Sequence, residues 1–250
     1  MMIDKIVKIT CRLGLPASLM HHNIGSLLHG VLMEQLNSES ADKLHLYRYN
    51  PIKQRLYFVE KVAMWEVVCL DSLISSELVQ IFGKFDSIYL KRHETAVSVS
   101  DVDIKEILLD DFVRRYMTET APKSLIKLAI LSPTSFKSEG YYDIFPDVKK
   151  MLRSIMLNFD YFSSSVKIYD YDALEYLAGQ VKILDYSLHS TRFSLEGVKL
   201  PSFKGKITLK LRGNIQTLQI LNLIFAFGEL SGVGIKTSLG MGYVKIQGVD

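Results

Sequence analysis

The chain has 250 residues, of which 48% are apolar and 23% charged, and its formal net charge is +3. This length and apolar content exclude a disordered protein and predict one large folded domain or two smaller ones. The small positive charge permits nucleic-acid binding but does not by itself indicate it, because such a footprint depends on where the charges gather.

The cysteines and the N-terminus indicate the compartment. Cys11 and Cys69 lie in apolar, strand-like runs without CxxC or Cys/His spacing, which predicts reduced thiols and no zinc site. The first residues read as the start of a strand rather than a signal peptide, and the apolar runs are too short to span a bilayer. The sequence therefore predicts a soluble, cytoplasmic protein with no membrane partner.

The first half of the chain shows elements in the order β-α-β-β-α-β. Residues 3–12 alternate between apolar and polar, as a half-buried strand does, and 16–36 form a helix with an apolar stripe. A short extended piece is predicted at 44–49 and a hairpin at 55–59 with 64–70. A helix closed by glycine follows at 71–82, and a strand at 87–99.

The second half repeats this order without a visible sequence repeat. Strands are predicted at 124–131, 183–193, 203–212 and 242–247, and helices at 146–162, with Pro146 in the first turn, and at 215–227. The pattern predicts an α+β fold of two tandem ferredoxin-like (βαββαβ) domains, over residues 1–119 and 120–250, with the seam in the turn at 117–123.

A glycine-rich loop lies between the last helix and the last strand. Its glycines follow a G-x-G-x5-G-x-G frame, formed by Gly232, Gly234, Gly240 and Gly242. Such density predicts a shaped loop, and Lys236 and Ser238 within it suit a phosphate backbone. A nucleotide P-loop is excluded, because its GxxxxGK[ST] spacing is absent and the element order is helix, loop, strand.

Segment 228–245 resembles the C-terminal glycine-rich loop of the repeat-associated RNA-binding (RAMP) superfamily of CRISPR systems. The resemblance extends to residues 16–58 and to Leu131-Ser-Pro-Thr-Ser-Phe136. Within the superfamily, the chain resembles the endoribonuclease that cuts precursor CRISPR RNA into guide units, and 28–33 with 234–242 resemble the version serving type III systems.

The resemblance implies a definite chemistry and definite partners. It implies metal-independent cleavage of repeat RNA by 2′-hydroxyl attack, which leaves a 2′,3′-cyclic phosphate and a 5′-hydroxyl, with no cofactor. It implies precursor CRISPR RNA as the partner rather than DNA, with transient association with a type III effector complex.

Metal-free RNA cleavage needs a proton acceptor, a proton donor and a cation near the phosphorane. Histidine suits both proton roles, and His22 and His29 share one face of the predicted helix. These histidines could instead be solvated or packed at an edge. A metal site between them has little support, because no carboxylate joins them on that face.

The resemblance assigns roles to particular positions. Leu44-His45 followed by Lys53 matches the family's order after the helix, which implies His45 as general acid and Lys53 as the stabilising cation. Many relatives carry a tyrosine where this chain has Met33. His29, one turn earlier, is the expected substitute as the second proton-transfer group.

A basic strand is the strongest binding feature outside the loop. In 204–212, one face carries Lys204, Lys206, Lys210 and Arg212, while apolar residues alternate on the other. This pattern suits an RNA backbone, although an edge strand protected by lysines would look the same.

Two other functions compete with the enzyme. A non-catalytic RNA-binding subunit of a CRISPR effector complex would share the fold and the glycine loop but lack the histidine-bearing helix and loop. A ferredoxin-like interaction protein would use its glycines only to close a turn. The histidines favour the enzyme over the first, and the basic strand with Lys236 and Ser238 disfavours the second.

Overall fold

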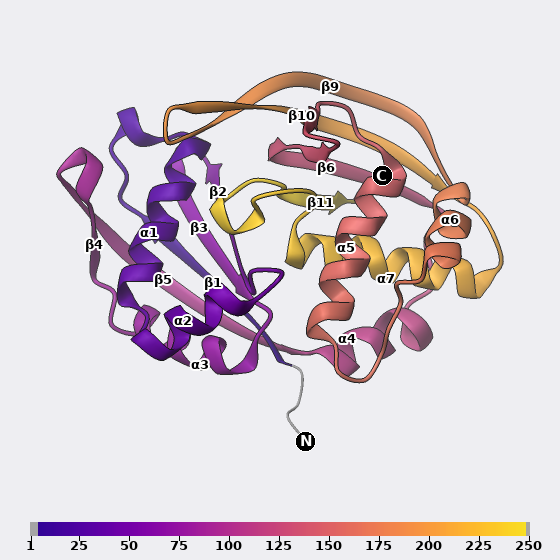
Figure 1. Ribbon diagram of the computed structural model, residues 1–250, viewed down its shortest axis with the longest axis horizontal. Coiled ribbons are helices and arrows are strands. Elements are labelled where there is room, and N and C mark those ends of the chain that lie inside the picture. Colours follow the sequence, from indigo (N-terminus) through magenta and orange to yellow (C-terminus); the bar gives the residue numbers. More distant parts are fainter. Residues whose placement is uncertain (1–4, 249–250) are drawn as a thin grey trace. The chain divides into compact units, whose positions relative to one another are not determined.

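The computed structural model describes residues 5–248. Within them the chain forms two compact units, 5–108 with 238–240 and 109–237 with 241–248 (Figure 1). We refer to these as unit 1 and unit 2. The chain divides into these units after Leu108, and the domain boundary between residues 119 and 120 remains a prediction.

Unit 1 is built on a five-stranded antiparallel sheet with strand order β2-β3-β1-β5-β4. Strands β5, β1, β3 and β2 have the ferredoxin-like order, and β4 is added at one edge. The strands are β1 (Lys5–Leu13), β2 (Ile52–Val59), β3 (Val62–Cys69), β4 (Ser87–Leu90) and β5 (Thr95–Leu108); the helices are α1 (Gly25–Gln35), α2 (Ser38–Leu46) and α3 (Ser72–Phe82). The start of the first predicted strand, at residues 3 and 4, lies outside the described residues.

The core of unit 1 lies between the sheet and its helices. Leu28 and Leu32 of α1 and Leu78 of α3 are fully buried there with Trp65 of β3. Trp65 packs against the ring of Phe82 with 5.1 Å between centroids. The apolar stripe predicted for the first helix is therefore the face that α1 buries, and α3 buries a face of its own.

Three predictions for unit 1 are wrong. The helix predicted over 16–36 begins only at Gly25, because two short 3-10 helices, Ala17–Leu19 and His22–Ile24, precede α1. Residues 44–49 are not extended as a whole, because α2 runs to Leu46; its cap is Asn37, whose side chain accepts a hydrogen bond from Ser40 N at 2.8 Å. The strand predicted over 87–99 is two strands, β4 and β5, which turn at Glu94 with a φ of 46°.

Unit 2 repeats the ferredoxin-like order in a four-stranded antiparallel sheet, β11-β6-β10-β9. Its strands are β6 (Leu125–Thr134), β9 (Val181–Leu195), β10 (Val198–Leu211) and β11 (Val244–Gln247), and its two main helices are α5 (Val148–Phe162) and α7 (Ile215–Ser231). Phe159 of α5 packs edge-on against Phe227 of α7, 5.1 Å between centroids. The predicted tandem ferredoxin-like fold is confirmed.

Smaller elements of unit 2 differ from the sequence expectation. Helix α5 is capped by Asp147, which accepts from Lys150 N at 2.8 Å, so Pro146 precedes the helix and is not in its first turn. The sequence did not predict α4 (Leu109–Arg114), α6 (Tyr171–Gly179) or the small hairpin of β7 (Phe136–Ser138) and β8 (Tyr141–Asp143). Across residues 5–248, the helices are all too short or too polar to span a membrane.

Candidate functional site

The three predicted catalytic residues all lie on unit 1. His29 is on α1, His45 is the penultimate residue of α2, and Lys53 is the second residue of β2. No hydrogen bond joins His29 to His45 among the described residues, and their catalytic roles remain predictions.

His29 is half-buried on α1. Its Nδ1 is buried and has no hydrogen-bond partner among residues 5–248. Burial lowers the pKa of His29 below its ordinary value of 6.5, because desolvation disfavours the charged imidazolium. At neutral pH the ring is therefore uncharged and able to accept a proton.

His45 is exposed near the C-terminal end of α2. The preceding residue, Leu44, is 9% exposed and belongs to the hydrophobic core. The pair Leu44-His45 therefore anchors one side chain in the core and presents the next to solvent, where a substrate can reach it.

Lys53 is only 5% exposed. It shares a face of β2 with Arg55, whose Nε lies 2.6 Å from the Glu66 carboxylate. Burial lowers the pKa of Lys53 to about 7, and the nearby Cys69 thiol opposes this shift. The proposed cation is thus deeply set, and its charge depends on pH in the neutral range.

We expect the stability of the fold to depend on the Lys53 amine. The unfolded chain binds its proton more tightly than the folded chain, so this group makes stability rise with pH between about 7 and 10.5. Urea unfolding at about pH 7 and about pH 9 should show the wild type gaining more than about 1 kcal/mol relative to Lys53→Met. Parallel pH dependence in the two proteins would contradict this expectation.

The glycine-rich loop is braced by segment 132–135, part of the Leu131–Phe136 motif singled out in the sequence. Gly242 N donates to Pro133 O at 3.0 Å, and Ile235 N donates to Ser135 O at 3.1 Å. Across the loop itself, Val233 N donates to Gly242 O at 2.9 Å. Two parts of the resemblance that are far apart in sequence therefore form one structure.

The tip of the loop, Ser238–Gly240, belongs to unit 1 and lies against the start of α1. The Gln54 amide donates to Gly25 O at 2.9 Å and to Ser238 O at 2.6 Å. Trp65 Nε1 donates to the oxygen of the same amide at 2.9 Å, which fixes its orientation. A Cβ on Gly25 would lie 2.4 Å from Leu239 O, so only glycine permits this approach.

Most of the loop is packed rather than open. Gly232, Gly240 and Gly242 are buried, Gly234 and Ser238 are half-buried, and Lys236 is exposed. Within the loop Lys236 is therefore the residue best placed to meet a phosphate, and RNA contact by the glycines and Ser238 remains a prediction.

The basic strand predicted at 204–212 lies in the second half of β10, where buried and more exposed residues alternate from Lys206 on: Lys206 is exposed and Ile207 is buried. The edge-strand alternative is wrong, because β10 pairs with β6 on one side and β9 on the other. Lys210 is half-buried, Arg212 lies just beyond the strand, and Lys204 is half-buried with its pKa lowered by burial.

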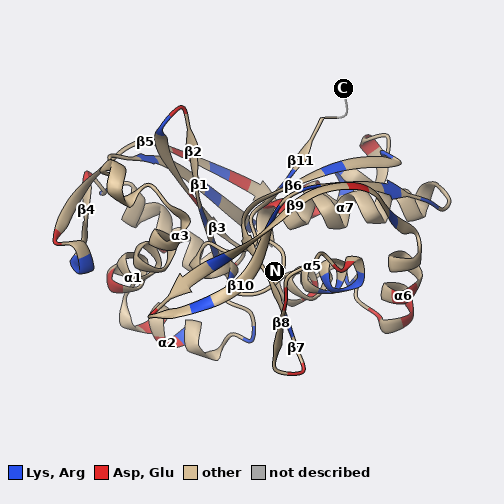
Figure 2. Cartoon of the chain, turned by 90° about the horizontal axis from the view of Figure 1, so that it is seen from above, with Lys and Arg blue, Asp and Glu red and all other residues tan. Residues whose placement is uncertain are grey.

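Neighbouring strands enlarge this basic surface. On the same face, Lys245 of β11 and Lys206 of β10 both pair with Ala129 of β6, one from each side. Lys127 of β6 lies opposite Thr208 of β10. Lys182 of β9 lies opposite Lys210 of β10. Asp185 is an acidic residue on this face. We call the five lysines, Lys127, Lys182, Lys206, Lys210 and Lys245, the basic sheet face; Figure 2 shows basic segments along β10.

No group of three or more His, Cys, Asp or Glu side chains within residues 5–248 is arranged to hold a metal ion. Cys11 and Cys69 are buried thiols whose pKa burial raises to about 12, so they are not nucleophiles at neutral pH.

The tandem ferredoxin-like fold, the braced glycine-rich loop and the lysine-lined sheet are together typical of the repeat-associated RNA-binding proteins of CRISPR systems. Comparison with known proteins identifies the family within this class of protein. The family described as CRISPR-associated endoribonuclease Cas6 matches residues 128–244. The Cas6 of Streptococcus thermophilus is 30% identical over 219 residues, 88% of this chain and 89% of that relative. The chain belongs to the Cas6 family of CRISPR-associated endoribonucleases.

More distant relatives agree. A Cas6 of Mycobacterium tuberculosis is 24% identical over 98% of this chain and 80% of its own length. Among solved structures, a Cas6 product complex superposes with a TM-score of 0.78 at 20% identity, over 98% of this chain and 100% of that one. A Thermus thermophilus Cas6 gives 0.75 at 17% identity, over 99% and 100%. At these identities the structures show a shared fold.

Proposed function

We propose that this protein cleaves CRISPR repeat RNA within precursor transcripts to give guide RNAs, without a metal ion. The observation that carries the proposal is the placement of a half-buried His29, whose pKa is lowered by burial, and an exposed His45 on two helices of one unit in a Cas6-family chain. Relatives solved as product and substrate-mimic complexes support RNA as the ligand.

The proposed reaction transfers two protons, one from the RNA to His29 and one from His45 to the RNA. His29 takes the proton of the 2′-hydroxyl, whose oxygen attacks the adjacent phosphorus. The bond from phosphorus to the 5′-oxygen breaks, and His45 gives that oxygen a proton. The products are a 2′,3′-cyclic phosphate and a 5′-hydroxyl, and Lys53 is the proposed cation for the phosphorane.

Product ends and metal dependence test the proposal together. Repeat RNA incubated with excess EDTA should be cut once, with a cyclic phosphate at the new 3′ end. Tight binding without cleavage would instead favour a non-catalytic subunit of an effector complex. Neither binding nor cleavage would refute RNA recognition altogether.

We propose that the basic sheet face binds the RNA backbone, with Lys204, Arg212 and Lys236 at its margins. The double variant Lys206→Ala/Lys210→Ala should weaken binding and lower the slope of log Kd against log salt by roughly 1.5, since each phosphate contact releases counterions. The control Lys84→Ala/Lys91→Ala, exposed on unit 1, should leave that slope unchanged. Equal slopes for the two double variants would remove the basic sheet face from the proposal.

We also propose where the protein acts and with what. It works in the cytoplasm, in transient association with a type III effector complex. Residues 28–33 and 234–242, which resemble the type III version, support that assignment.

A further inference from the structure

The helix that carries His45 is held mainly by polar contacts. In α2 only Leu44 is buried, whereas α3 buries Ile74, Leu78 and Phe82 almost completely. A helix as short as α2 is marginal in water without tertiary contacts. Other contacts must therefore define where its C-terminal end, and with it His45, lies.

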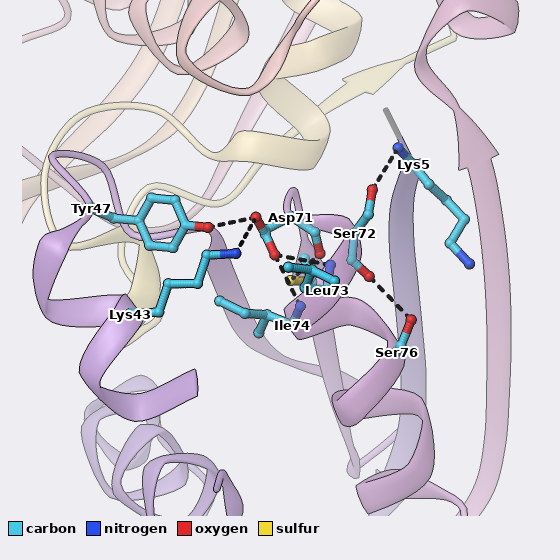
Figure 3. A network of polar contacts seen from close by, with 9 residues as sticks. Lys5, Lys43, Tyr47, Asp71, Ser72, Leu73, Ile74 and Ser76 are labelled. Carbon is cyan, nitrogen blue, oxygen red and sulfur yellow. Dashed lines mark hydrogen bonds and ion pairs between the residues drawn. The ribbon is translucent and has the colours of Figure 1, made fainter. Parts of the chain in front are cut away.

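One carboxylate connects the two helices. Asp71 caps α3, its Oδ1 accepting from Leu73 N and Ile74 N at 3.0 Å each. Its other oxygen, Oδ2, accepts from the Tyr47 hydroxyl at 2.5 Å (Figure 3). Tyr47 directly follows α2, so Asp71 fixes the end of α2 to the start of the better-packed α3.

Lys43 strengthens the same connection. Its Nζ lies 3.6 Å from Asp71 Oδ2 and 5.7 Å from the centroid of the Tyr47 ring. Figure 3 shows Lys43 and Tyr47 reaching the carboxylate side by side. In the chain they stand two residues before and two residues after His45, so both flanks of the histidine are bound to one side chain.

The other end of α2 is also attached to α3. Asn37 N, immediately before the helix, donates to Glu77 Oε1 of α3 at 2.6 Å. Helix α3 thus holds α2 at both ends through Asp71 and Glu77.

We propose that Asp71 and Tyr47 are positioning residues that set the location of the His45 imidazole for proton donation. The inference rests on the proposed role of His45 as general acid. A general acid must stand within hydrogen-bond reach of the leaving oxygen, and a displacement of about 1 Å can lower a rate by roughly 10²-fold. The Tyr47–Asp71 contact prevents such a displacement.

Tyr47→Phe tests this most cleanly, because it removes the hydroxyl and keeps both the ring beneath Lys43 and the cap of α3. Single-turnover cleavage at saturating protein should fall about 10-fold, while the Kd for repeat RNA stays unchanged. The matched control Tyr89→Phe removes a hydroxyl from an exposed tyrosine of β4 and should cleave at the wild-type rate.

The double variant His45→Ala/Tyr47→Phe shows whether Tyr47 acts through His45. If the double variant cleaves no more slowly than His45→Ala, the inference is supported. Once the imidazole of His45 is gone, loss of the Tyr47 hydroxyl has no general acid left to displace. An additional 10-fold loss would overturn it, since Tyr47 would then act elsewhere.

The remaining outcomes separate this inference from the function on which it rests. Full cleavage by Tyr47→Phe with none by His45→Ala would overturn the positioning role and leave the proposed function standing. Full cleavage by His45→Ala would overturn the acid assignment and the positioning role together. Should Tyr47→Phe fail to fold, Asp71→Asn replaces it, because asparagine still caps α3 but lacks the charge that holds Lys43.

Discussion

His45→Ala should cut repeat RNA at least about 10²-fold more slowly than the wild type, the usual size of one acid–base contribution. The side chain is exposed at the end of α2, so its removal leaves the core unchanged. The expected loss is therefore in the cleavage step, measured under single-turnover conditions with repeat RNA at saturating protein, while the Kd and thermal stability remain those of the wild type.

A matched histidine provides the control. His93 is exposed in the turn between β4 and β5, and His93→Ala should cleave normally. His29→Ala should show a loss of similar size to His45→Ala if it is the base. Cleavage by His45→Ala at the rate of His93→Ala would rule out the acid assignment.

Gly242→Ala should destabilise the fold by about 3 kcal/mol or more, which places it in the exceptional tail of point mutations. The residue has a φ of +76°, and an added Cβ would lie 2.2 Å from Val233 O. That oxygen belongs to loop backbone rather than to a side chain that can rotate away. The free energy of unfolding in urea measures the loss.

The variant Gly140→Ala separates the cost of the positive φ from the cost of the steric clash. Gly140 has a similar φ of +86°, but no atom lies within 4 Å of the position its Cβ would take. It should lose only the roughly 1–2 kcal/mol that the left-handed conformation costs. Equal losses at the two positions would show that the close approach inside the glycine-rich loop contributes nothing.

Local patterns predicted those parts of the fold that local interactions determine. The hairpin around Glu60-Lys61 turns where expected, with φ values of 48° and 65°. Helix α3, predicted over 71–82, begins one residue later, after its cap Asp71, and ends before Gly83 as the sequence indicated. Helix α2 was missed because it buries a single residue and so has almost no apolar stripe.

Pairing between distant segments could not be read from the sequence. The basic sheet face takes Lys127, Lys182 and Lys245 from the three other strands of the sheet, β6, β9 and β11, and each lysine alone looks like an ordinary surface residue. The burial of Lys53 was equally hidden, because the first five residues of β2 are buried on both faces. Alternation predicts which residues share a face, but not what covers that face.

The membership of Ser238–Gly240 in unit 1 has a consequence for the order of events during synthesis. The ribosome makes residues 5–108 first, yet Gln54, only 3% exposed, has one of its amide partners at Ser238. Until that late segment emerges, the surface around the start of α1 lacks its final neighbour. The helix bearing His29 therefore reaches its finished surroundings only after residues 238–240 have been translated, so a product that ends before them would carry this histidine without its completed setting.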